Sequence, residues 1–320
     1  MNALVISGGG SKGAYAGGLA EYLIKDCGRD YDLFIGTSTG GLLAPLLAAG
    51  KLNAAKQAFT TCNQKSIYKI CPFIVKKHGP GQFSTSINHL GIIKMFAKGK
   101  KTFGDSSNLR KLIKKFFLKD DFKRIRDRGK KVFVTVSNLT NEVVEYKSSD
   151  DYEYEEFCDW MWASANALPF MSLMVKDGIE YGDGGFGAAI PIQKAINEMA
   201  EWIDVIALRP VQKTKNTPPV SNVFDVLTKT FDFVLNQISL DDLMIGQLEA
   251  RHYKVDIQFY YTPRVLSDQI FIFDPEQMSN WWSEGYKIGR TSTPAMHCVA
   301  YKEKNNPIDP DRMGEDMELL

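Results

Sequence analysis

The sequence predicts an α/β fold in which helices cover both faces of a central, mostly parallel sheet, giving three α/β/α layers. Two short strand patterns, residues 4–7 and 32–35, each stop at a glycine-containing turn. Helical patterns follow them at residues 14–25 and 40–49. Strands and helices that alternate at this spacing are typical of a parallel sheet covered on both sides.

Each early element has a local signal. In residues 14–25 the side chains of Tyr15, Leu19, Tyr22 and Leu23 share one stripe at helical spacing. Pro45 falls inside the second helix, where a proline kinks the helix or belongs to its first turns. Residues 59–104 mix aromatic residues, lysines, prolines and glycines, and they give no clear periodicity. No element is therefore predicted there.

The second half of the chain also contains strand and helix patterns. A proline-rich stretch at residues 210–220 predicts a loop or hinge within it. The predicted strands lie at residues 131–138, 204–208 and 256–260, with residues 142–146 pairing beside the first of them. The predicted helices lie at residues 109–118, 160–167, 221–250 and 275–290.

We expect one domain over residues 1–292 and a polar, mobile tail over residues 293–320. The 320 residues are 44% hydrophobic and 24% charged, which is ordinary for a globular protein. Five cysteines without metal-ligand spacing predict reduced thiols. The first residues lack a secretory pattern and no apolar run reaches the ~20 residues of a membrane span. We therefore expect a cytoplasmic protein, with or without peripheral contact to the inner face of a membrane.

The charge is unevenly distributed. Residues 94–131 contain 15 Lys and Arg against 4 Asp, a local net charge of +11, whereas the rest of the chain carries −10. Phenylalanines interleave with these charges, so residues 59–131 resemble a basic lid or insert. Either this face binds an anionic lipid surface or it is a solvated helical face whose phenylalanines belong to the core. The apolar residues 67–75 are a second candidate lid, or an irregular loop. No other feature suggests nucleic-acid binding.

A strand–turn–helix pattern surrounds Ser38. The pentapeptide from Gly36 to Gly40 follows the apolar residues 33–35 and leads into a helix. A serine on such a sharp turn presents its hydroxyl away from the backbone, while the helix directs its N-terminal N–H groups at the same spot. The pattern suits a nucleophile, although a serine that caps the helix would give the same sequence.

A glycine loop, residues 8–13, follows the first strand. Its bare N–H groups suit an oxyanion, because fixed dipoles need no reorganisation during reaction. Gly8, Gly10 and Gly13 also fit the dinucleotide fingerprint. That reading is disfavoured because Asp32 begins the second strand, whereas the ribose-binding acid should stand at its end. A phosphate-binding Walker loop fails too, because Lys12 is followed by glycine.

A third segment, Asp183-Gly184-Gly185, would alone be read as a turn. Together, in this order and spacing, the three segments resemble the patatin-like phospholipase family, which carries a glycine loop, a Gly-x-Ser-x-Gly elbow and an Asp-Gly-Gly turn. Residues 134–140, 163–170, 191–196 and 273–289 are similar to further segments of the family. Ser7 departs from it, since the family often has an acidic residue there.

The resemblance implies a patatin-like fold and a catalytic dyad of Ser38 as nucleophile and Asp183 as base, with neither a metal nor a cofactor. The glycine loop would hold the oxyanion, and Lys12 would act electrostatically. The candidate oxyanion-hole residues are Gly8, Gly9, Gly10, Ser11, Lys12 and Gly13, and the elbow glycines are Gly36 and Gly40.

The four histidines have no motif-like context, and they are His78, His89, His252 and His297. By chain order, a Ser–Asp–His triad with His252 or His297 stays open.

The resemblance therefore implies a serine lipid acyl hydrolase of phospholipase A type that works through an acyl-enzyme. The alternatives are an esterase or lysophospholipase acting on soluble or single-chain esters and, less favoured, a non-catalytic nucleotide- or partner-binding protein. The expected partners are membrane phospholipids, contacted transiently, and an activating ligand or protein such as switches on some relatives. The sequence indicates neither the head group nor the oligomeric state.

Overall fold

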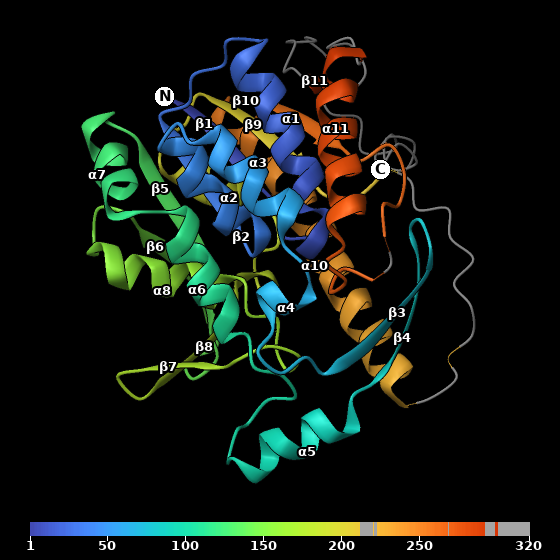
Figure 1. Ribbon diagram of the computed structural model, residues 1–320. Coiled ribbons are helices and arrows are strands. Elements are labelled where there is room, and N and C mark those ends of the chain that lie inside the picture. Colours follow the sequence, from blue (N-terminus) through green and yellow to red (C-terminus); the bar gives the residue numbers. More distant parts are fainter. Residues whose placement is uncertain (212–219, 221–222, 268, 292–297, 300–320) are drawn as a thin grey trace, which may run out of the picture.

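The computed structural model describes residues 1–211, 220, 223–267, 269–291 and 298–299. Within these ranges a nine-stranded sheet forms the centre of the molecule (Figure 1). Its strands are β1 (Asn2–Ile6), β2 (Leu33–Thr37), β5 (Lys131–Asn138), β6 (Val143–Ser148), β7 (Met174–Lys176), β8 (Ile179–Asp183), β9 (Trp202–Ala207), β10 (Asp256–Tyr261) and β11 (Cys298–Val299).

The strand order is β11-β10-β9-β1-β2-β5-β8-β7, with β6 also paired to β5. Strands β10, β9, β1, β2 and β5 run parallel to their neighbours in that order. The other four join through antiparallel pairs. The parallel centre places the carboxyl ends of β1 and β2 side by side, with Ile6 opposite Gly36.

Helices cover the sheet on both faces, as predicted. They are α1 (Gly13–Lys25), α2 (Thr39–Ala48), α3 (Leu52–Thr61), α4 (Gln64–Ile67), α5 (His89–Ala97), α6 (Ser107–Phe116), α7 (Lys119–Asp127), α8 (Tyr154–Ser164), α9 (Ile192–Asn197), α10 (Val223–Tyr253) and α11 (Pro275–Thr291). Two short 3₁₀ turns, η1 (Gly10–Lys12) and η2 (Gly184–Phe186), complete the order.

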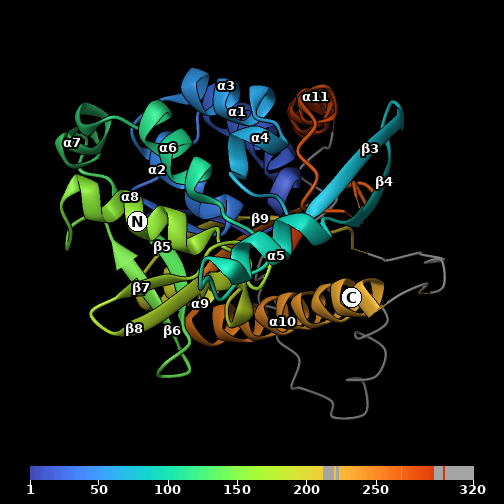
Figure 2. The same cartoon turned by 60° about the horizontal axis from the view of Figure 1, so that its bottom comes forward.

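The alternation of side chains along β1 shows the layers. Leu4 and Ile6 enter the core formed with α1, α2, α6, α8 and α11. Ala3 and Val5 point the other way, into the core formed with α9 and α10. In Figure 2, α1 and α3 lie on one side of β9 and α10 lies on the other. The predicted three-layer α/β/α fold is confirmed.

One prediction needs correction, and one segment without a prediction contains defined elements. The helix predicted at residues 160–167 begins earlier and ends at Ser164, because the backbone carbonyl of Asn166 accepts the N–H of Asp183 (3.0 Å) and cannot continue a helix. Residues 59–104, which gave no pattern, contain α4, α5 and a two-stranded ribbon of β3 (Phe73–Gly79) and β4 (Gln82–Ile87). The ribbon is exposed along most of its length and so lacks one-sided alternation.

Other predictions concern residues that lie wholly or partly outside the described ranges. Most of the proline-rich stretch at residues 210–220, and His297, lie outside the described residues. So does the predicted tail of residues 293–320, apart from Cys298–Val299, which pairs with β10. None of the described helices combines the length and the apolar character needed to cross a bilayer.

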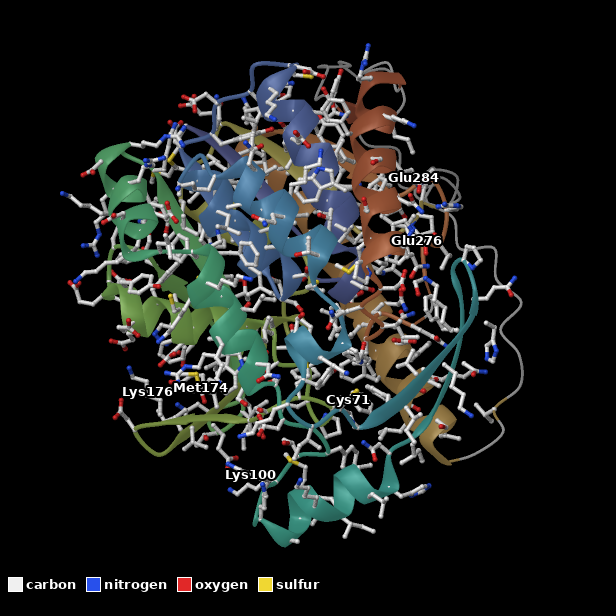
Figure 3. All side chains as sticks on the ribbon, in the orientation of Figure 1. Cys71, Lys100, Met174, Lys176, Glu276 and Glu284 are labelled. Atoms are coloured by element: carbon white, nitrogen blue, oxygen red, sulfur yellow. The ribbon has the colours of Figure 1, made fainter. Side chains whose placement is uncertain are left out.

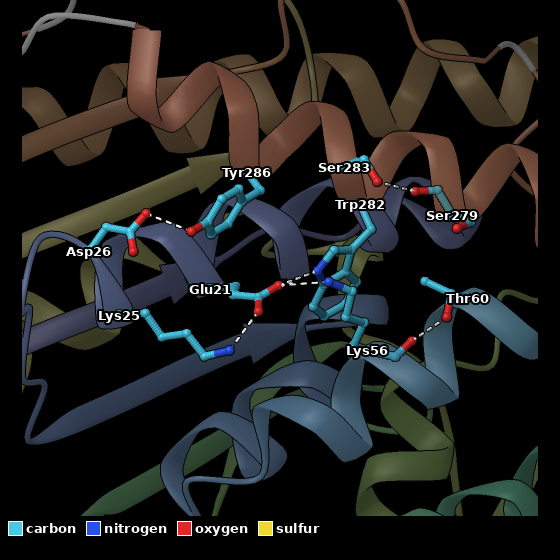
Figure 4. A network of polar contacts seen from close by, with 9 residues as sticks. All are labelled: Glu21, Lys25, Asp26, Lys56, Thr60, Ser279, Trp282, Ser283 and Tyr286. Atoms are coloured by element: carbon cyan, nitrogen blue, oxygen red, sulfur yellow. Dashed lines mark hydrogen bonds and ion pairs between the residues drawn. The ribbon is translucent and has the colours of Figure 1, made fainter.

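Helices α1 and α11 cross at small residues around a buried tryptophan. A Cβ atom on Gly18 would come within 1.9 Å of the carbonyl oxygen of Trp282, so only glycine allows this approach. The fully buried indole of Trp282 donates to the Glu21 carboxylate (2.6 Å), which Lys25 and Lys56 also contact (Figure 4). Burial by itself raises the pKa of Glu21, but these groups outweigh it, so the pKa is lowered and the carboxylate stays charged and paired.

We expect Trp282→Ala to lower the free energy of unfolding by about 3–5 kcal/mol, because it leaves a large cavity between α1 and α11. Trp282→Phe keeps most of the volume and loses one hydrogen bond, so a loss of about 1–2 kcal/mol is expected. Urea unfolding followed by circular dichroism measures both variants. Equal losses for the two would show that packing is not the main contribution.

Candidate active site

The loops that follow β1 and β2 meet in one cavity of about 140 Å³. Ser38, Asp183 and the glycines of the loop at residues 8–10 line it together. The remaining walls are mainly apolar and come from α2, α4, α6 and α10 and from residues 270–273. Segments that are far apart in the sequence thus converge at the carboxyl edge of the parallel strands, where α/β proteins bind ligands.

Ser38 stands on a strained turn between β2 and α2. Its backbone has φ 55° and ψ −120°, which is unusual for a residue with a side chain. The turn is tight because Gly40 packs against the strand end, where an added Cβ would lie 2.2 Å from the carbonyl oxygen of Ile6. The N–H of Ser38 donates to the hydroxyl of Ser164 on α8 (3.0 Å). The arrangement fixes the serine at the N-terminus of α2, facing the cavity.

Asp183 ends β8 beside the serine. The antiparallel pairing of β8 with β5 sets Asp183 opposite Val136. Its carboxylate accepts the Gly185 N–H (2.8 Å), and the hydroxyl of Ser38 is near enough to lower its pKa. Burial raises the pKa of Asp183 to about 6, although the Gly185 N–H and the Ser38 hydroxyl favour the charged form. A carboxyl group with this pKa accepts a proton more readily than an exposed one.

The described histidines lie away from this pair. His78, His89 and His252 are exposed, and none of them lines the cavity. His78 contacts Ser84 across the β3–β4 ribbon, and His252 packs against Tyr253 at the end of α10. Within the described chain, the triad alternative therefore has no histidine near Ser38.

The N–H groups of Gly9 and Gly10 have no hydrogen-bond partner among the described residues. Both glycines line the cavity, and the chain at Gly10 has φ +57°, which favours glycine. A Cβ on the neighbouring Gly8 would be 3.3 Å from the Cβ of Ser38, which shows how closely the loop approaches the serine. Two open donors therefore remain for a ligand.

The other backbone N–H groups of the predicted oxyanion loop already donate within the protein, and such a group is not available to a ligand. Four of the six candidates are occupied. Gly8 donates to Ala189 O (3.0 Å), Ser11 to Ile270 O (3.0 Å), Lys12 to Gly9 O (3.2 Å), and Gly13 to Gly10 O and Ser11 O.

Lys12 has a structural contact as well as a place at the cavity. Its Nζ donates to the carbonyl of Leu208 (2.8 Å), just beyond the end of β9. This bond ties the glycine loop to the neighbouring parallel strand. The predicted electrostatic role stays a prediction.

Asp242 on α10 supports the site, although no sequence pattern singled it out. Its carboxylate accepts the N–H of Ile190 (2.8 Å), next to Ala189, and burial raises its pKa to about 7. Ala189 in turn accepts the N–H of Gly8. Asp242 therefore connects α10 to the glycine loop. In the sequence it stands beside Asp241 in a helical pattern, which is typical of a solvated face.

A second, apolar cavity of about 60 Å³ adjoins the first. The two share Thr39, Leu42, Ile67, Leu109, Phe273 and Gly10 among their lining residues. The second cavity continues between α2, α3 and α6 into the core. Within the described residues, no group of three or more His, Cys, Asp or Glu is placed to hold a metal ion.

An α/β fold with a serine at a strand–helix elbow beside a buried aspartate defines a class of hydrolase-like proteins. The family model described as patatin-like phospholipase matches residues 4–196, more than half of the chain. The chain belongs to the patatin-like phospholipase family, whose members hydrolyse lipid esters.

Among solved structures, the chain is similar to VipD from Legionella pneumophila, with a TM-score of 0.47 and 15% sequence identity. The similarity covers 91% of this chain and 66% of the VipD chain. No curated protein matches the sequence.

Proposed function

We propose that the protein is a serine lipid acyl hydrolase of phospholipase A type. One observation carries the proposal: Ser38, on a strained elbow, lies beside the buried carboxylate of Asp183 inside a mainly apolar cavity. A nucleophile within hydrogen-bond reach of a base of raised pKa is the arrangement that covalent acyl transfer requires.

The reaction proceeds in two steps. Ser38 Oγ attacks the ester carbonyl carbon while Asp183 takes the hydroxyl proton, and the N–H groups of Gly9 and Gly10 stabilise the oxyanion. The ester C–O bond then breaks, and Asp183 returns the proton to the departing alcohol. In the second step Asp183 takes a proton from water, the hydroxide attacks the acyl-enzyme, and the fatty acid leaves as Ser38 regains its proton.

The cavities favour an acyl chain as the occupant next to Ser38. Leu42, Leu109 and Phe273 belong to both cavities, so an apolar wall continues from the serine into the second one. The two are small beside the ~300–1,000 Å³ of typical ligand pockets, which favours one acyl chain at a time. A single-chain lysophospholipid or soluble ester is therefore the second candidate substrate.

Lipid mass spectrometry tests the proposal. The protein is incubated with vesicles of mixed phospholipids and, separately, with lysophospholipid micelles. Free fatty acid and lysophospholipid from the vesicles would support phospholipase A activity and identify the head group. Products from the micelles alone would favour the second candidate. Labelling by a fluorophosphonate probe, with the modified residue identified by peptide mapping, shows in addition whether Ser38 is a competent nucleophile.

The raised pKa of Asp183 predicts the pH dependence. The base must be ionised to accept the serine proton, so kcat/KM should rise with pH through about 6 and then level off. Activity is lost as pH falls below that value. The profile is measured on a soluble chromogenic ester.

Asp242 titrates in the same range, with a pKa raised to about 7 by burial, but it does not line the cavity. The control is therefore Asp242→Asn, because the asparagine oxygen still accepts the Ile190 N–H. The midpoint near pH 6 should persist in this variant. If the midpoint disappeared with Asp242, the profile would not report on Asp183.

A further inference from the structure

Helix α5 presents an apolar face outward. Leu90, Ile93 and Phe96 are 81%, 62% and 52% exposed, whereas Met95 and Gly91 are buried and attach the helix to the body. In Figure 1, α5 lies at the bottom of the molecule, away from α1, α2 and α3. The turned view of Figure 2 brings it to the front. Three large, exposed apolar side chains on one short helix indicate an interaction surface.

The surroundings of α5 are basic. The chain contains no Asp or Glu between Asp32 and Asp105, and residues 94–101 include four lysines. Of these, Lys101 pairs with Glu180 (2.8 Å), while Lys94, Lys98 and Lys100 form no ion pair among the described residues. Figure 3 labels Lys100 at one end of α5. Charge complementarity therefore favours an anionic occupant.

The rest of the basic segment at residues 94–131 differs. Phe117 and Phe122 are buried in the core, and Arg110 forms a two-bonded pair with Asp159. The apolar residues 67–75 are also largely packed inside, since Ile67 and Phe73 are buried. Among the described residues of segment 94–131, the part at α5 therefore places Lys94, Lys98 and Lys100 beside exposed apolar side chains.

A row of aromatic rings leads from α5 to the site. Phe96 contacts Phe103 with ring centroids 6.1 Å apart, and Phe103 contacts Phe170 at 6.4 Å. Phe170 in turn contacts Phe231 (5.6 Å) and Phe271 (5.2 Å), both of which line the cavity of Ser38. The exposed face of α5 is thus continuous, through aromatic side chains, with the walls of the active site.

We propose that α5 docks the protein on an anionic phospholipid bilayer, with Leu90 and Ile93 inserted among the acyl chains and Lys94, Lys98 and Lys100 on the head groups. Amphipathic helices of this kind bind in the plane of the interface, and their binding depends on apolar area and on anionic lipid together. Docking there sets the aromatic row at the membrane. The use of the aromatic row to bring lipid to Ser38 rests on the proposed function, whereas the docking of α5 on the bilayer does not.

Vesicle co-sedimentation tests the docking without any hydrolysis, using the Ser38→Ala protein. Vesicles of phosphatidylcholine alone are compared with vesicles containing phosphatidylglycerol. We expect binding to the anionic vesicles that weakens with salt. Leu90→Ser with Ile93→Ser should lower the partition coefficient roughly tenfold or more. Each exchange of Lys94, Lys98 or Lys100 for Gln should lower it roughly fivefold, on anionic vesicles only.

The matched control is Met199→Ser. Met199 is 83% exposed, but it lies just before β9 at the amino edge of the sheet, opposite the site, so its exchange should leave binding unchanged. Unaltered binding of the α5 variants would overturn the proposal. The proposal would also be overturned if the wild-type protein bound neither kind of vesicle, which is the result expected if α5 instead binds a protein partner.

A second assay separates docking from catalysis. On a soluble short-chain ester the Leu90→Ser, Ile93→Ser enzyme should match the wild type, while its rate on anionic vesicles should fall with its binding. Equal losses on both substrates would contradict a docking role. A wild type that binds vesicles but cleaves neither substrate would refute the hydrolase and leave the docking surface supported.

Discussion

Ser38→Ala is expected to abolish ester hydrolysis, with a fall in kcat of about 10⁴–10⁶-fold. The hydroxyl is the only group that forms the acyl-enzyme in the proposed mechanism, and alanine leaves the oxyanion donors of Gly9 and Gly10 in place. Residual turnover would come from those donors alone. The rate is measured on a soluble chromogenic ester, and covalent labelling by a fluorophosphonate should disappear in parallel.

Ser239→Ala is the matched control for this change. Ser239 lies on α10 and lines the same cavity, but its hydroxyl donates to the backbone carbonyl of Leu235 in its own helix (2.8 Å). Its loss should change the rate by less than about threefold. A Ser38→Ala enzyme that still formed an acyl-enzyme would refute Ser38 as the nucleophile, and peptide mapping of the labelled protein would then locate the true one.

The sequence predicted those parts of the fold and site that depend on neighbouring residues. The elbow at Ser38 is local, since strand, glycine, serine and helix follow one another, and its position on a strained backbone is what the pattern predicts. The strands β1, β2 and β5 are short buried runs, so the sequence predicted them equally well. The ribbon β3–β4 was missed because most of its side chains are exposed on both faces.

The details of the site depend on contacts that no local pattern encodes. Ser11 was a candidate oxyanion donor because it stands in a glycine-rich loop. Its N–H is consumed by Ile270, some 260 residues further along the chain. Asp242 likewise acts through Ile190, on a distant loop. Only the tertiary structure shows which backbone N–H groups remain available to a ligand, because folding pairs the others with distant acceptors.

Asp183→Asn is expected to lower kcat by about 10³–10⁴-fold, with little effect on folding. The asparagine oxygen still accepts the Gly185 N–H, and the side chain has the same shape, but its amide cannot take the proton of Ser38. Burial raises the pKa of Asp183 to about 6, so ionisation of the wild-type carboxyl opposes folding as pH rises from about 4 to about 6. The variant avoids this cost and should unfold no more easily than the wild type at pH 7.

Asp232→Asn controls for the loss of one negative charge at the same cavity, because Asp232 also lines it, from α10. Its rate should stay within about tenfold of the wild type and keep the rise near pH 6. The two variants are compared by kcat, pH profile and urea unfolding. If Asp183→Asn remained active with an unchanged profile, another group would be the base. Since no described histidine lines the cavity, that result would refute the dyad and leave the two-step mechanism without an identified proton acceptor.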